Sequence, residues 1–131
     1  MALRILIVED SVSIRMLYQE VLHKAGYEVE VATDGQVALR LAQAQPFDCI
    51  VVDMLMPNLD GLAFLKAFDC RRHPKTRVIM ASNLDDPQKR EQALALGAAA
   101  YIIKAEVSLP ELLRKIDPTR PAPGASAEGV H

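Results

Sequence analysis

Short, mainly apolar runs that end at a polar residue recur along this chain. They cover residues 3–8 before Glu9-Asp10, residues 49–52 before Asp53, residues 78–81 before Ser82, and residues 100–103 before Lys104. Runs this short and this rich in Val and Ile are typical of strands buried on both faces of a parallel sheet. Val29 and Val31 indicate one further strand between the first two runs.

Helix signals lie between these strands. Helices are predicted after Ser11, from residues 33–35 to Gln45-Pro46, from Gly61 to Arg72, from residues 85–87 to Gly97, and after the capping-box pattern Ser108-Leu109-Pro110-Glu111. Strands and helices that alternate in this way predict an α/β fold. We therefore expect a (βα)5 arrangement, with a doubly wound, parallel, five-stranded sheet that carries helices on both faces.

The composition is that of one globular domain. Half of the 131 residues are hydrophobic and the mean hydropathy is +0.09, so the chain can build a core of its own. We assign residues 1–117 to this domain. From residue 118 the sequence is rich in Pro, Ala and Gly without an apolar period, which predicts a flexible tail or a truncated linker for residues 118–131.

Charge and hydropathy narrow the expected surroundings. The net charge of −2 gives no reason to expect nucleic-acid binding, and no apolar stretch approaches the length of a membrane span. The N-terminus does not look like a signal peptide. Cys49 and Cys70 have no metal-ligand spacing and are expected to be reduced thiols without a catalytic role. We expect a cytoplasmic protein.

Three carboxylates follow two of the predicted strands. Ligands of an open α/β sheet bind outside the carboxyl ends of its strands, so neighbouring strands bring Glu9, Asp10 and Asp53 together. Like charges this close repel one another unless a cation lies among them. Oxygen ligands of this kind suit Mg²⁺, and the sequence therefore predicts a magnesium site at this edge.

Ser82 and Lys104 end two further strands at the same edge. A metal ion, an ammonium and a hydroxyl around one carboxylate can neutralise the oxygens of a phosphoryl group. One carboxylate is then the nucleophile, and the others hold the metal.

The ordered set of these segments resembles the receiver domains of two-component response regulators, over about residues 3–117. The matching pieces are Ile7-Val8-Glu9-Asp10-Ser11, Val52-Asp53-Met54-Leu55-Met56-Pro57 with Asp60-Gly61, Val78-Ile79-Met80-Ala81-Ser82, and Tyr101-Ile102-Ile103-Lys104. The resemblance implies a CheY-like, flavodoxin-like fold with strand order 2-1-3-4-5.

The resemblance also implies a role for each site residue. Asp53 matches the phosphoacceptor. Asp10 is expected to bind Mg²⁺ directly, Glu9 through water, and Leu55 through its backbone carbonyl. Ser82 and Lys104 are expected to contact phosphoryl oxygens. Tyr101 matches the aromatic that turns inward when the hydroxyl residue moves toward the phosphoryl group, although its spacing also fits a half-buried strand tyrosine.

The implied partners are a sensor histidine kinase or phosphotransfer protein, and an output protein or fused domain. The exposed part of the first helix matches the kinase-docking surface, at Ser13, Ile14, Leu17 and Tyr18. The output surface is expected on the fourth helix, fifth strand and fifth helix, and a phosphorylation-dependent homodimer is left open. A receiver assists its own phosphorylation and dephosphorylation only, so we expect no separate enzymatic activity.

The chain departs from the family pattern at four positions. Ala105 stands where a cis proline is usual, and a non-proline cis bond costs about 2.5–4 kcal/mol, so we expect a trans bond. Asn83 replaces a small residue beside the acceptor, where it could narrow access or add a hydrogen bond. Leu55 and Leu84 flank the position of the attacking water and cannot orient it by hydrogen bonding, which predicts a long-lived phosphoryl group.

Three other readings compete with this one. A phosphatase of the haloacid dehalogenase type needs a second Asp two residues after the nucleophile, where Leu55 stands. A mononucleotide-binding module needs a Gly-rich or Ser/Thr-rich loop after the first strand, where Glu9 and Asp10 stand instead. A degenerate receiver that docks partners without phosphorylation remains the alternative, because Asn83 and Ala105 depart from the pattern.

Overall fold

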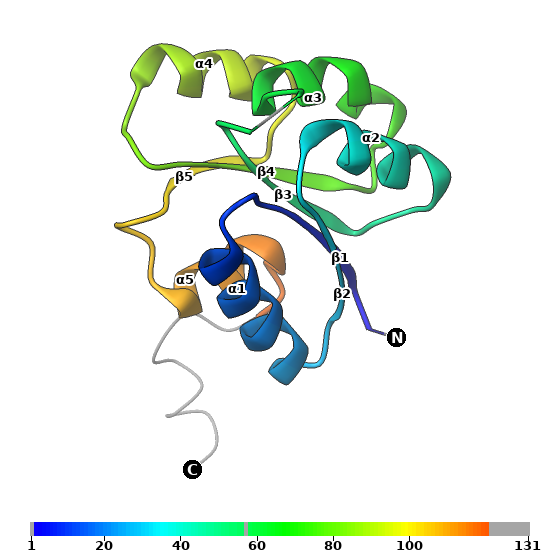
Figure 1. The fold of residues 1–131 in the computed structure, drawn as a ribbon, viewed down its shortest axis with the longest axis vertical. Helices are drawn as coiled ribbons and strands as arrows, with labels where there is room; N and C mark the ends of the chain where they lie inside the picture. The colour runs from blue at the N-terminus through cyan, green and yellow to red at the C-terminus, as the bar shows by residue number, and fades with distance from the viewer. Residues whose placement is uncertain (1, 57, 121–131) are drawn as a thin grey trace.

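A computed structural model describes residues 2–56 and 58–120 and contains one parallel sheet of five strands (Figure 1). The strand order is β2-β1-β3-β4-β5. The strands are β1 (Arg4–Val8), β2 (Glu28–Ala32), β3 (Cys49–Asp53), β4 (Arg77–Ser82) and β5 (Ala100–Ile103). The fold class and the strand order expected from the sequence are both confirmed.

Helices cover both faces of the sheet, as Figure 1 shows. They are α1 (Val12–Lys24), α2 (Gly35–Ala44), α3 (Gly61–Phe68), α4 (Pro87–Ala95) and α5 (Leu109–Ile116). Helices α1 and α5 pack on one face, and α2, α3 and α4 pack on the other. Side chains alternate along each strand, so Ile5 and Ile7 face α1 and α5, whereas Leu6 and Val8 face the other helices.

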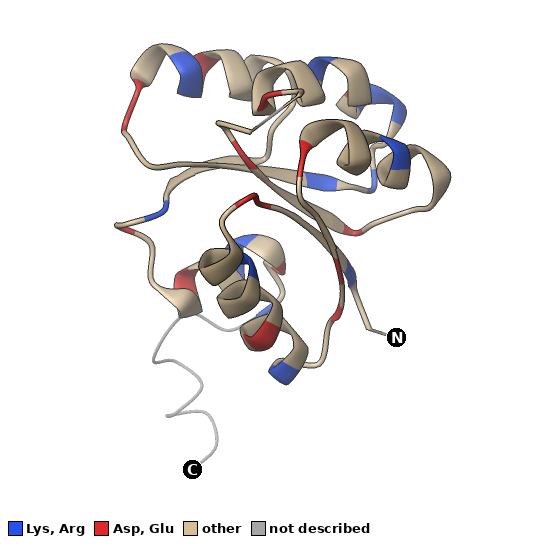
Figure 2. Cartoon of the chain, viewed as in Figure 1, with Lys and Arg blue, Asp and Glu red and all other residues tan. Residues whose placement is uncertain are grey.

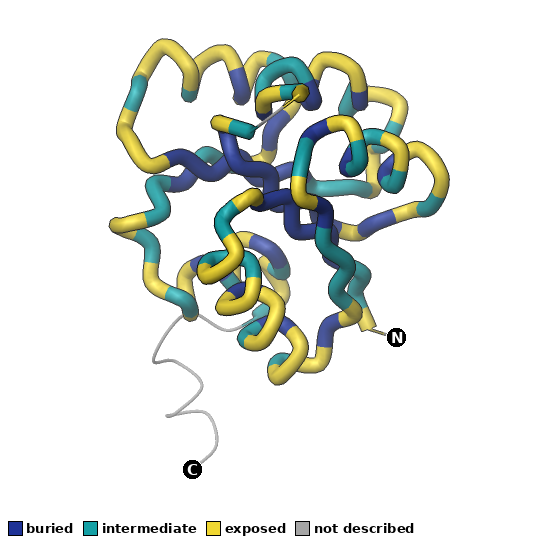
Figure 3. Tube along the Cα trace, in the orientation of Figure 1, coloured by how far each residue is buried: buried dark blue, intermediate teal, exposed yellow. Residues whose placement is uncertain are grey.

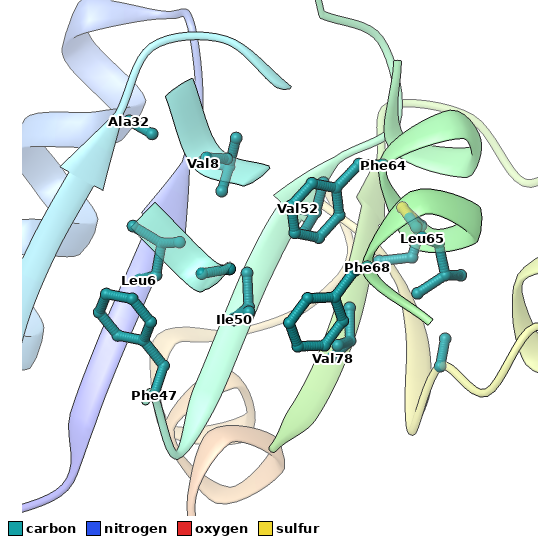
Figure 4. Packing of buried hydrophobic residues seen from close by; sticks show 14 of the residues in the cluster. Leu6, Val8, Ala32, Phe47, Ile50, Val52, Phe64, Leu65, Phe68 and Val78 are labelled. Carbon is teal, nitrogen blue, oxygen red and sulfur yellow. The ribbon is translucent and has the colours of Figure 1, made fainter. Parts of the chain in front are cut away.

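The core therefore consists of two layers that share the sheet. The layer under α2, α3 and α4 contains Leu6, Ile50, Val52, Phe64 and Phe68, all buried (Figure 4). The five residues of β3 are all buried, because β3 is the central strand and has helices on each side. Figure 3 shows this buried centre inside a shell of exposed helix surfaces.

A side chain caps the N-terminus of four of the five described α-helices. Asp34, Asp60 and Asp86 cap α2, α3 and α4 through their carboxylates, and Ser108 forms the predicted capping box with Glu111. Ser11 occupies the N-cap position of α1, but its side chain makes no capping hydrogen bond.

The third helix is shorter than predicted. It ends at Phe68, and Asp69 takes a left-handed conformation with φ of 57° before a 3-10 turn, η1 (Cys70–Arg72). The apolar period of the helix stops at Phe68, and Asp is among the residues that tolerate this conformation. The prediction of one continuous helix from Gly61 to Arg72 was therefore wrong.

The chain after α5 contacts the domain. The Tyr27 hydroxyl donates to Asp117 at 2.9 Å, and the Arg120 guanidinium donates to the Tyr27 hydroxyl at 3.0 Å. Arg120, which lies in the predicted tail, thus touches the domain, and residues 121–131 lie outside the described part. Among the described helices, none combines the length and the apolar character needed to cross a membrane.

Candidate functional site

Three carboxylates converge where β1 and β3 end. Val8 pairs with Val52 in the sheet, so Glu9 and Asp53 follow neighbouring strands at the same level. One carboxylate oxygen from each of Glu9, Asp10 and Asp53 lies within 4.8 Å of the other two. Glu9 and Asp53 are buried, whereas Asp10 is exposed. Figure 2 shows the acidic segments after β1 and at the end of β3.

Lys104 bridges two of these carboxylates from the end of β5. Its ammonium lies 2.7 Å from Glu9 Oε1 and 3.1 Å from Asp53 Oδ2. The side chain of Lys104 is only 7% exposed, so this ion pair is shielded from water. The Lys104–Ala105 peptide bond is trans, as predicted, and the trans bond still brings the ammonium to Asp53.

Burial and the neighbouring charges act against each other at Asp53 and Lys104. Burial raises the pKa of Asp53, the Lys104 ammonium works to lower it, and the Glu9 charge adds to the rise. Burial alone would lower the pKa of Lys104, but its hydrogen bonds to Glu9 and Asp53, together with their negative charges, outweigh burial and raise it. Lys104 is therefore held as an ammonium, with its charge directed at the two buried carboxylates.

The charge balance of the cluster fits a divalent cation. One ammonium offsets one of the three negative charges, which leaves two. The remaining donors are carboxylate oxygens that open to solvent on the side of Asp10, and hard cations such as Mg²⁺ prefer such donors. The residues present therefore suit the predicted ion.

Ser82 and Tyr101 each form a hydrogen bond with the backbone of Leu84. The Ser82 hydroxyl is buried at the end of β4 and accepts a hydrogen bond from the Leu84 amide at 3.2 Å. The Tyr101 hydroxyl donates to the Leu84 carbonyl at 3.3 Å. Tyr101 is half-buried, which matches the expectation for a strand tyrosine.

The structure adds residues that the sequence analysis missed. The Arg15 guanidinium donates to the Glu9 carbonyl at 3.1 Å and so reaches back from α1 to the strand end. The Ser11 amide donates to Glu9 Oε2 at 3.1 Å. An Arg placed one turn into the helix that follows an acidic strand end is the signal that could have revealed the first contact. The Lys104–Glu9 contact depends on tertiary structure alone.

The predicted docking residues of α1 do not share one environment. Ser13 and Leu17 are exposed and Ile14 is half-buried. Tyr18 is only 6% exposed and packs with Leu22 and Leu112 in the layer under α1 and α5. The placement of Tyr18 on the exposed surface was therefore wrong, because α1 turns this position toward α5.

Three of the residues that depart from the family pattern are exposed on the loops that follow β3 and β4. Leu55 is 68% exposed and Leu84 is 74% exposed, and Asn83 is also exposed. A backbone N–H of Leu55 supports the charged form of Asp53 and so lowers the pKa of that carboxyl, against the larger effect of burial. The loops after β3 and β4 thus present apolar side chains beside the acidic cluster.

The chain belongs to the response regulator receiver domain family, whose model matches residues 5–117. It is 33% identical over 134 residues to a probable transcriptional regulator, ycf27, of Cyanophora paradoxa. The aligned region covers 97% of this chain and 55% of that protein. The chain thus spans about half the length of that relative.

Solved structures show the same architecture. The chemotaxis protein CheY4 of Vibrio cholerae, crystallised at low pH, is 34% identical to this chain, with a TM-score of 0.82. The superposition covers 92% of this chain and 100% of that one. The CheY of a CheX-CheY-BeF3-Mg complex from Borrelia burgdorferi is 26% identical with a TM-score of 0.79, covering 87% and 86% of the two chains. Receiver domains belong to two-component systems, and so does this chain.

Proposed function

We propose that Asp53 accepts a phosphoryl group from a histidine kinase or a phosphotransfer protein and that Mg²⁺ is needed for the transfer. The observation that carries this proposal is the convergence of Glu9, Asp10 and Asp53 with the buried Lys104 ammonium at one edge of the sheet. A similar protein from Borrelia burgdorferi is named with BeF3 and Mg in its complex, which supports the choice of ligand.

The chain supplies the nucleophile and, through Lys104 and Ser82, part of the charge stabilisation. A carboxylate oxygen of Asp53 attacks the phosphorus in line, and the phosphorus–nitrogen bond of the donor histidine breaks, with its electron pair and a proton going to the imidazole. Lys104, 3.1 Å from Asp53, balances the charge of the phosphoryl oxygens. The Ser82 hydroxyl donates to another oxygen. Asp10, Asp53, the Leu55 carbonyl and, through water, Glu9 would hold Mg²⁺, which would supply positive charge to the phosphoryl oxygens.

The product is an acyl phosphate whose hydrolysis resets the domain. Water attacks the phosphorus, inorganic phosphate leaves, and the Asp53 carboxylate returns. The chain assists only its own phosphorylation and dephosphorylation, so it does not turn over a separate substrate. The output is a shift in conformational populations.

The partners follow from this role. The kinase or phosphotransfer protein docks over the acceptor and the exposed part of α1, at Ser13, Leu17 and the half-buried Ile14. The output is a partner protein or a fused domain, and regulation of transcription is one output of a similar protein. The output surface consists of α4, β5 and α5.

Phosphorylation by acetyl phosphate tests the proposal, with the product measured as intact mass. We expect a gain of one phosphoryl group that requires Mg²⁺ and that Asp53→Asn abolishes. Asp48→Asn, at the opposite end of the same strand segment, is the matched control and should behave as the wild type. If the chain gains no phosphoryl group, the test is repeated with a cognate kinase, because Asn83 could exclude small donors. Failure there would favour a phosphorylation-independent docking module.

A further inference from the structure

Arg15 reaches back from the first turn of α1 to the segment that follows β1. Its Nη1 atom donates to the Glu9 carbonyl oxygen at 3.1 Å and lies 3.5 Å from the Asp10 carbonyl oxygen. The Arg15 side chain is half-buried, so water competes less for these contacts than on an open surface. One guanidinium therefore contacts the backbone of both acidic residues at the end of β1.

The two carbonyls lie between the hydrogen-bond patterns of the strand and of the helix. The Glu9 amide continues the pairing of β1 with β2, to the Ala32 carbonyl at 3.1 Å, and the helical pattern begins at the Ser11 carbonyl, which accepts from the Arg15 amide at 2.9 Å. Ser11 gives α1 no side-chain cap. A shielded backbone carbonyl needs a hydrogen-bond donor, and at this junction the Arg15 guanidinium supplies one.

The position of Asp10 depends on this junction more than that of Glu9 does. Both oxygens of the Glu9 carboxylate are held, by the Lys104 ammonium at 2.7 Å and by the Ser11 amide at 3.1 Å. The Asp10 side chain, by contrast, is exposed. The placement of the Asp10 carboxylate therefore follows from the backbone that Arg15 contacts.

We propose that Arg15 is a positioning residue for Asp10: its guanidinium fixes the backbone that joins β1 to α1 and thereby raises the affinity of the acidic cluster for Mg²⁺. This inference rests on the proposed function, since it concerns the ion of the same site. A contact that fixes a ligand before the ion binds removes the cost of ordering that ligand at binding.

The test is a titration of the full chain with magnesium chloride at constant ionic strength, followed through the backbone amide signals in NMR spectra. The Tm without Mg²⁺ is measured on the same samples, which separates stability from affinity. Arg15→Met removes the guanidinium, and Arg15→Lys keeps the charge and a donor group. Lys89→Met removes an exposed positive charge of α4 and is the control.

We expect Arg15→Met to bind Mg²⁺ about three- to tenfold more weakly than the wild type, because the lost contact acts on the backbone of a ligand rather than on the ligand atom. Direct electrostatics predicts the opposite sign, since removing a positive charge favours the binding of a cation. Lys89→Met should therefore bind Mg²⁺ equally or more tightly.

Arg15→Lys should recover part of the affinity lost in Arg15→Met. Charge cannot explain such a recovery, because the lysine ammonium repels Mg²⁺ as the guanidinium does. An Arg15→Met variant that binds Mg²⁺ as tightly as the wild type, or more tightly, overturns the proposal, even if its Tm is lower. An Arg15→Lys variant that binds no better than Arg15→Met also overturns it.

A wild-type chain that binds no Mg²⁺ contradicts the proposed function. Hydrogen exchange of the Glu9 and Ser11 amides then decides separately whether Arg15 fixes the junction. Faster exchange of these amides in Arg15→Met, absent in Lys89→Met, sustains the positioning role. Equal exchange rates in the three proteins overturn it.

Discussion

At the scale of the residue, the three carboxylates of the site differ in their burial and in the groups that they contact. Asp53 is buried and contacts Lys104, Glu9 is buried and shares its two oxygens between Lys104 and the Ser11 amide, and Asp10 faces solvent. The sequence places all three at strand ends but does not show which of them Lys104 contacts. That information depends on the spacing between β1, β3 and β5 in the folded sheet.

The exposed side chains of Leu55 and Leu84 lead to a prediction about the lifetime of the phosphoryl group. Leu55 and Leu84 offer no hydrogen bond to the water that attacks the acyl phosphate. We expect the double variant Leu55→Asn, Leu84→Glu to lose its phosphoryl group about tenfold faster, since polar side chains there can orient the water. The measurement is the decay of phosphorylated protein after removal of the donor. Leu94→Gln, on an exposed leucine of α4, is the control, and equal decay rates in all proteins would refute the prediction.

The buried thiol of Cys49 makes a second prediction at this scale. Burial raises the pKa of Cys49 to about 12, so at pH 8 the group is a neutral thiol, and the thiolate is the reactive form. In a Cys70→Ser background, iodoacetamide should label the chain only after unfolding. Labelling of the native chain at a rate near that of a free thiol would contradict the burial of β3.

At the scale of the element, the hydrophobic pattern was sufficient for the strands, because a strand buried on both faces has a distinct apolar run. The predicted end of α3 was wrong, because residues 69–72 contain no Gly or Pro to mark it, and the left-handed Asp69 ends the helix where its apolar period stops. The pattern also failed at Tyr18, because the side of α1 that faces α5 depends on how the two helices pack. The hydrophobic pattern likewise could not predict that the backbone of Leu59 lies close to Gly35.

The contact between α2 and the β3–α3 loop yields a prediction about stability. A Cβ atom added at Gly35 would lie 2.0 Å from the Leu59 carbonyl oxygen. Ala is favoured over Gly within a helix by about 1 kcal/mol, but overpacking costs about 1–3 kcal/mol, and here the obstacle is backbone. We expect Gly35→Ala to lower the free energy of unfolding by about 1–2 kcal/mol in urea denaturation. Gln36→Ala, at the exposed neighbouring position, should change it little, and a stabilised Gly35→Ala would disprove the contact.

At the scale of the whole molecule, the sheet brings together residues that lie up to 95 positions apart, as Lys104 and Glu9 do. The family resemblance was enough to predict this convergence, because it fixes the strand order. The secondary-structure pattern alone allows several orders for five parallel strands. The contact of the Arg90 guanidinium with the Tyr101 ring could not be predicted in either way, since it depends on a side chain of α4 that the family pattern does not specify.

The net negative charge of the carboxylate cluster predicts how the whole molecule responds to Mg²⁺. A ligand that binds only the folded state at ten times its Kd stabilises that state by about 1.4 kcal/mol. This corresponds to a rise in Tm of about 3–6 °C for a domain of this size. Thermal unfolding with Mg²⁺ and with a chelator measures the shift.

Asp10→Asn is the informative variant in the same experiment. It removes one of the repelling charges, so its Tm without Mg²⁺ should exceed that of the wild type, and the increment with Mg²⁺ should disappear. Asp48→Asn should retain the wild-type increment. An undiminished increment in Asp10→Asn would place the ion elsewhere.

The most direct test of the central claim is to identify the atom that carries the phosphoryl group. Borohydride reduces an aspartyl phosphate to homoserine with release of phosphate, so the modified position can be read by peptide mass spectrometry. After treatment with acetyl phosphate and Mg²⁺, we expect homoserine at position 53 and none in a sample without Mg²⁺. Homoserine at Asp10 instead, or a borohydride-resistant phosphate on Ser82, would contradict the assignment of Asp53 as the acceptor.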